Sequence, residues 1–177
     1  MDQNMHIDLS MTPVEQMMKH CLSLRPDIRD KILAPDEFSD YLLWLIENFQ
    51  NKAGFQYKPQ DIAQFFSNSR TKDVINQVKA SPKDPATLSA LSAGLANHQE
   101  DNYMLAGQDI SVGRMLRYFP SQWHTTDYFE VFYALSGECP VYFEDEVVTV
   151  KPGTVLIAAP SVTRATPCYA DDRVLMF

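Results

Sequence analysis

The chain has 177 residues, of which 45% are hydrophobic, and its formal net charge at pH 7 is −8. This composition is typical of a globular protein that buries a core, and it excludes a chain that is disordered throughout. The basic residues are scattered, which argues against a nucleic-acid surface on these residues, because phosphate binding draws most of its affinity from clustered Lys and Arg.

The three cysteines lie at wide spacings and form no Cys-x-x-Cys pair. They therefore predict reduced thiols in place of a zinc ribbon or a disulfide framework. No apolar run reaches the roughly 18 residues of a membrane span, and no basic start leads into an apolar stretch. We therefore expect a cytoplasmic protein with no membrane partner.

Residues 1–100 are expected to form a helical region. The segment Thr12-Pro13-Val14-Glu15 supplies an N-cap threonine, a proline at the first helical position and a glutamate that can reach back to the cap amide. Apolar residues recur behind it at helical spacing, and we interpret this stripe as core. Its members are Val14, Met17, Met18, Cys21 and Leu22.

A second helix is expected from Pro35-Asp36-Glu37 to about Asn51, with its acids at the positive end of the helix dipole. Its buried face is predicted to consist of Phe38, Tyr41, Leu42, Leu45 and Phe49. Shorter helices are expected at 59–66, at 71–78 and from 84 to about 97.

Residues 101–177 change in character, because β-branched and aromatic residues dominate in short runs. The expected strands are 103–105, 111–119, 127–135, 141–143, 147–150, 154–158 and 174–177. Hairpins are expected at Pro120-Ser121, at Asp145 and at Ala170-Asp171-Asp172. Short strands joined by turns predict an antiparallel barrel or sandwich.

Two turn-and-strand units stand out in this second half. In 123–137, a dense aromatic and β-branched run carries Glu130 in its middle and ends at a glycine. In 151–160, Pro-Gly makes a corner before an apolar run that ends at a proline. These units resemble the two motifs of the cupin barrel, most closely the form at the N-terminus of AraC-type transcription regulators. The resemblance covers roughly Asn102 to Phe177.

Several positions carry that resemblance. His124, Glu130 and Gly137 stand where the first motif has a histidine, a glutamate and its closing glycine. Gly153 and Pro160 match the second motif.

Two other positions depart from the pattern. Thr126 and Arg164 stand where metal-binding cupins place histidines. An arginine guanidinium cannot lose its proton to become a metal ligand, and His124 with Glu130 alone is too small a donor set for a tight site. We therefore expect no metal, no cofactor and no catalytic residues.

Glu130 has its side chain on the same face of the expected strand as Tyr128 and Phe132. A carboxylate inside an apolar barrel costs several kcal/mol unless it is paired or hydrogen-bonded. Arg164 is the candidate partner, directly or through a ligand, and hydrogen bonds to backbone amides are the alternative. An aromatic-lined barrel with a few polar groups also suits a small molecule. The predicted ligand-binding residues are His124, Glu130, Arg164, Tyr128, Phe132 and Trp123.

The expected fold class is α+β, with a helical region (1–100) before a small antiparallel cupin-like β-barrel (101–177). We expect this barrel to be incomplete at its C-terminus. The resemblance implies the effector-sensing and dimerisation portion of an AraC-type regulator: a homodimer with a small-molecule effector, and no enzyme. DNA would be contacted only through a C-terminal domain missing from this chain, which we expect to be a fragment. The alternatives are a stand-alone metal-dependent cupin enzyme using His124 and Glu130, and a structural dimer platform with no ligand.

Overall fold

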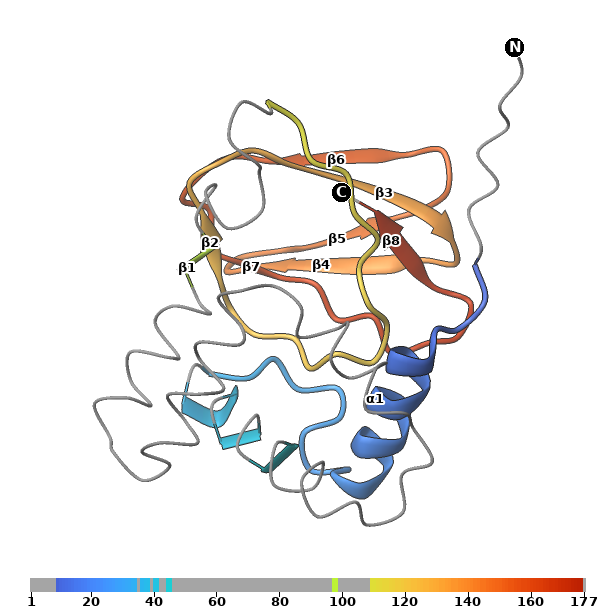
Figure 1. Ribbon diagram of the computed structural model, residues 1–177. Helices are drawn as coiled ribbons and strands as arrows, with labels where there is room; N and C mark the ends of the chain where they lie inside the picture. The colour runs from blue at the N-terminus through green and yellow to red at the C-terminus, as the bar shows by residue number, and fades with distance from the viewer. Residues whose placement is uncertain are drawn as a thin grey trace.

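The computed structural model describes residues 9–34, 36–38, 40–41, 44–45, 97–98 and 109–176. In Figure 1 the β-strands form one region, and helix α1 (Pro13–Leu24) packs beside it. Among the described residues, no helix has both the length and the apolar character needed to cross a membrane.

Helix α1 begins as the sequence predicts. The Glu15 amide donates to Thr12 Oγ1 over 3.2 Å, and the Thr12 amide donates to Glu15 Oε2 over 2.8 Å, so both halves of a capping box are present. The apolar stripe is core, because Met17, Met18, Cys21 and Leu22 are all buried.

Described residues of the second predicted helix, 36–38, 40–41 and 44–45, are helical. Phe38, Tyr41 and Leu45 are buried in one apolar cluster with the stripe of α1. The helices expected at 59–66 and 71–78 lie outside the described residues, as does most of the one expected from 84. Its expected last residue, Asn97, belongs instead to strand β1 (Asn97–His98), which pairs in parallel with β2 (Thr125–Thr126).

Two antiparallel sheets of three strands make the β region. The first has the order β6-β3-β8 and the second the order β5-β4-β7. Their bounds are β3 Glu130–Ser136, β4 Cys139–Phe143, β5 Val147–Val150, β6 Val155–Ala158, β7 Arg164–Ala165 and β8 Val174–Met176. Both sheets contribute to a second apolar cluster, made of Phe132, Ala134, Cys139, Val141, Val150, Ala158, Cys168 and Leu175.

The strand expected at 111–119 is not formed. Only Arg114 makes an isolated bridge, to Met176, and the Met115 amide donates to Leu175 O over 2.9 Å. Two features interrupt the strand: Arg117 turns inward to bond Glu15, and Tyr118 has φ +65°, which is not an extended conformation. This short pairing nevertheless covers an edge of β8.

Two of the three predicted hairpins are also wrong. Near Pro120-Ser121, Ser121 O accepts the Leu33 amide over 2.9 Å, so this segment pairs with the loop after α1. At 170–172 the chain turns, but it passes from β7 in one sheet to β8 in the other. The hairpin at Asp145 is confirmed, since it joins β4 to β5 and the Phe143 amide donates to Glu146 O over 2.8 Å.

The turn glycines of the two motif units have left-handed backbones. Gly137 has φ +65°, and a Cβ placed there would lie 2.7 Å from Asp172 O. Gly153 has φ +85° in the corner before β6, with nothing within 4 Å of such a Cβ. Both positions favour glycine, and only Gly137 is also crowded.

Candidate functional site

Strand β3 places the acid of the first motif on its inner face. Glu130, Phe132 and Ala134 are buried, whereas Val131 and Tyr133 between them are exposed. The alternation of strand side chains therefore holds as predicted, and the Glu130 carboxylate points into the β region.

Strand β7 places Arg164 beside the first motif. The His124 amide donates to Arg164 O and the Arg164 amide donates to His124 O, each over 3.0 Å. This bridge aligns the end of the second motif with the entry to β2, which holds Thr126. The positions at which the resemblance places metal ligands thus meet at one point of the fold.

The Arg164 guanidinium is fully buried, and its nitrogens are bonded on several sides. Its Nε donates to Glu130 Oε2 over 2.6 Å, its Nη2 to Thr126 Oγ1 over 2.6 Å, and its Nη1 to Val162 O over 2.7 Å. Nη2 also forms an ion pair with Glu130 Oε2. The Thr126 hydroxyl in turn donates a hydrogen bond to Tyr128 O over 2.8 Å. The direct contact proposed between Glu130 and Arg164 is therefore present.

This closed cluster balances its own charge. Glu130 is 8% exposed and Arg164 is 0% exposed, so neither side chain is well solvated. Removing either partner would leave the other charge buried without compensation, which is far more costly than losing a surface ion pair. A ligand that used the Arg164 fork would first have to displace Glu130 or Thr126.

His124 is half-buried at the edge of the cluster. The pKa of its imidazole is lowered to about 4, because burial and the charge of Arg164 lower it by more than a hydrogen bond to Gln122 O raises it. The ring is therefore neutral at pH 7. Its Nδ1 lies 3.2 Å from Gln122 O, and a carbonyl only accepts, so we assign the proton to Nδ1.

The aromatic residues of the predicted ligand set are placed differently from one another. Phe132 is fully buried in the core cluster between the sheets, while Trp123 and Tyr128 are half-buried. A role for any of the six in ligand binding stays a prediction. Within the described part of the chain, no three His, Cys, Asp or Glu side chains gather where they could hold a metal ion.

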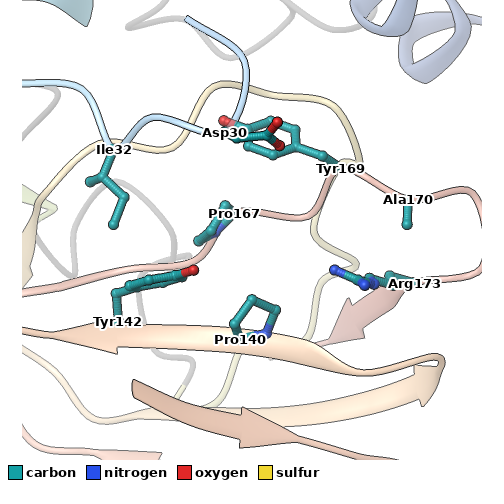
Figure 2. A pocket seen from close by; sticks show the side chains of 8 residues that line it. All are labelled: Asp30, Ile32, Pro140, Tyr142, Pro167, Tyr169, Ala170 and Arg173. Carbon is teal, nitrogen blue, oxygen red and sulfur yellow. The ribbon is translucent and has the colours of Figure 1, made fainter. Parts of the chain in front are cut away.

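The sequence did not predict a cavity of about 430 Å³ that lies on the outward side of β4 and is shown in Figure 2. It is lined by Asp30, Ile32, Pro140, Tyr142, Pro167, Tyr169, Ala170 and Arg173. One signal was available in the alternation along β4, where Cys139 and Val141 are buried and Pro140 and Tyr142 must face the other side. The residues from the loop after α1 carry no such signal.

No protein-family model matches the chain, and no curated protein matches it either. Among solved structures it is similar to a cupin-2 domain containing protein from Shewanella frigidimarina, with 18% identity over 37% of this chain and 64% of that chain, at a TM-score of 0.31. It is similar to protein NMB1881 from Neisseria meningitidis, with 20% identity over 37% of this chain and 67% of that chain, at a TM-score of 0.31.

A third similar structure is the Fe(II) form of HppE in complex with substrate, with 12% identity over 94% of this chain and 97% of that chain, at a TM-score of 0.31. Likenesses at this level do not carry function to this chain. What the chain can do is therefore argued from its own side chains.

Proposed function

We propose that this chain is the effector-sensing and dimerisation portion of an AraC-type bacterial regulator, built on a cupin-like β domain that works without a metal. The observation that carries the proposal is the buried guanidinium of Arg164, which Glu130 and Thr126 hold at the place where the resemblance calls for metal-binding histidines.

The donor chemistry of this cluster supports a domain that is not an enzyme. A guanidinium offers only N–H donors and stays protonated, so it cannot coordinate a cation. Glu130 is already occupied by Arg164. The remaining imidazole, His124, makes one donor, and transition-metal sites in proteins need three or more.

The outer face of the first sheet supports dimerisation. Val131 lies opposite Ile157, and Tyr133 lies opposite Val155, and all four side chains are exposed. Phe129, just before β3, adds a further exposed ring at 66%. Exposed apolar patches of this kind mark interaction surfaces, and we assign this one to a second copy of the chain.

Metal analysis tests the central claim. The protein is incubated with Fe(II), Mn(II) or Zn(II), desalted and measured for bound metal, beside the double variant T126H/R164H. We expect well below one metal per chain in the wild type and about one in the double variant, because His124 and Glu130 would then have two more donors. A stoichiometric, tightly held ion in the wild type would favour the metal-dependent enzyme instead.

Sedimentation tests the dimer. We expect the wild type to be a dimer, Val131→Lys to be a monomer, and the control Val147→Lys, which changes an exposed valine on the other sheet, to stay dimeric. A monomeric wild type would contradict the proposed dimerisation. Gel shifts with this chain alone should show no DNA binding, because its charge is −8.

A further inference from the structure

The cavity beside β4 has walls that are held in place by other contacts. It lies between the outward side of β4 and the loop after α1 (Figure 2). The Tyr169 hydroxyl accepts the Ser121 amide over 3.0 Å, and Ser121 O accepts the Leu33 amide over 2.9 Å. The loop carrying Ile32 and the segment carrying Tyr169 are therefore tied to one another through Ser121. Such a preformed space loses little entropy when it is filled.

Polar groups make up more of the exposed lining than apolar ones, but several apolar side chains lie beside them. Pro140 and Pro167 present rigid rings, and Ile32, Ala170 and the rings of Tyr142 and Tyr169 complete the walls. A volume of about 430 Å³ falls in the range of small-molecule sites.

Two polar groups converge on this space from different sides. In Figure 2 the Arg173 guanidinium and the Tyr142 hydroxyl both point toward its middle. Within the described ranges, no carboxylate forms an ion pair with Arg173. The Asp30 carboxylate stands at another part of the lining, with Oδ2 3.7 Å from Arg29 Nε.

We propose that this cavity binds a small organic monocarboxylic acid, with its carboxylate on Arg173 and its apolar body between Pro140, Pro167 and Tyr142. The planar guanidinium fork matches a carboxylate. One cation with Asp30 nearby suits a single negative charge better than a phosphate dianion. This inference rests on the proposed function, because it names the class of the effector. It places that effector on the outward side of β4.

The test uses matched probes on the full chain. Binding of benzoate, cyclohexanecarboxylate, benzamide and phenyl phosphate is measured by calorimetry and by ligand-observed NMR. We expect at least one carboxylate to bind saturably with a Kd below about 10 mM. Benzamide, which has the shape of benzoate without its charge, should bind at least about tenfold more weakly, since a charged hydrogen-bond pair is lost.

Variants locate the site. Arg173→Met keeps the aliphatic stem and should weaken carboxylate binding at least about tenfold. Ala170→Leu, which fills the cavity and keeps the guanidinium, should weaken it similarly if Arg173→Met proves unstable. The control Arg29→Met removes a nearby exposed cation outside the lining and should change the affinity by less than about twofold.

Three results would overturn the proposal: no saturable binding by either carboxylate, equal binding of benzamide, or unchanged binding in both cavity variants. The failure of this site and the failure of the proposed function are distinguishable. A metal-free dimer that ignores both carboxylates loses only the cavity site, whereas a metal-loaded or monomeric wild type contradicts the proposed function whatever the carboxylates do.

Discussion

Glu15 joins helix α1 to the segment that leads into the β region, and its replacement by glutamine tests this join. Its Oε1 accepts the Nε and the backbone amide of Arg117 over 2.9 and 3.1 Å, and its Oε2 accepts Arg114 Nη2 over 2.5 Å. Glu15 is 0% exposed and Arg117 is 2% exposed. The Glu15→Gln variant keeps the side-chain shape and removes the charge that both arginines contact.

The size of the effect follows from the pKa of Glu15. Burial alone would raise it, but hydrogen bonds from Arg117 and Thr12 and the charge of Arg114 outweigh burial and lower it from 4.5 to about 2. This lowering corresponds to about 3 kcal/mol of folding free energy. Because the folded pKa is depressed, the stabilisation is complete above pH 4.5 and is lost as the pH falls toward 2. About 2 kcal/mol of it should be gone by pH 3.

Urea unfolding of wild type and Glu15→Gln at pH 7, 5, 4 and 3 measures this directly. The difference in the free energy of unfolding should be about 3 kcal/mol at pH 7 and should shrink below pH 4.5. The control Glu138→Gln removes an exposed acid that pairs with Lys151 at 2.9 Å, and should cause no comparable change. A pH-independent difference, or one no larger than that of the control, would refute the reasoning.

Two further predictions concern stability within the β region. Arg164→Met should lower the free energy of unfolding in urea by about 3–5 kcal/mol, because it leaves the Glu130 carboxylate buried without a partner. Thr126→Val should lower it by about 1–3 kcal/mol in the wild type and by clearly less in the Arg164→Met background. Additive losses would contradict the shared cluster. Gly137→Ala should destabilise the fold by more than about 2 kcal/mol, because the strain at φ +65° adds to the clash of the new Cβ with Asp172 O. Gly153→Ala, where a Cβ meets nothing, should cost about 1 kcal/mol. Equal losses of stability in the two variants would contradict the crowding at Gly137.

The parts of this fold that local signals specify were predictable from the sequence. The capping box at Thr12 and Glu15 lies within four residues, and the faces of β3 follow from the two-residue period. The pairing of Glu130 with Arg164, 34 residues apart, could be proposed because the motif resemblance brought those two positions together.

The join made by Glu15 shows why other parts were missed. Its partners Arg114 and Arg117 lie 99 and 102 residues away. The capping role already explained the Glu15 carboxylate, so no local signal indicated that it also binds the two arginines. The same join accounts for the error at 111–119, where β-branched and aromatic residues predict a strand. Inward-turned Arg117 and the positive φ of Tyr118 override that propensity.

Arg164 stands where the resemblance places a metal-binding histidine, and it supplies a positive charge of its own at that position. A metal site needs deprotonated donors, such as neutral imidazoles and carboxylates, around a cation that is supplied from outside. Arg164 instead pairs its own positive charge with Glu130 and donates hydrogen bonds to Thr126 Oγ1 and Val162 O. The hydroxyl at 126 suits the arginine at 164, because it accepts from the guanidinium and donates its own hydrogen to Tyr128 O. The cluster is complete as soon as the chain folds, so an effector gains more from a space whose guanidinium, Arg173, forms no ion pair with a carboxylate of the described residues.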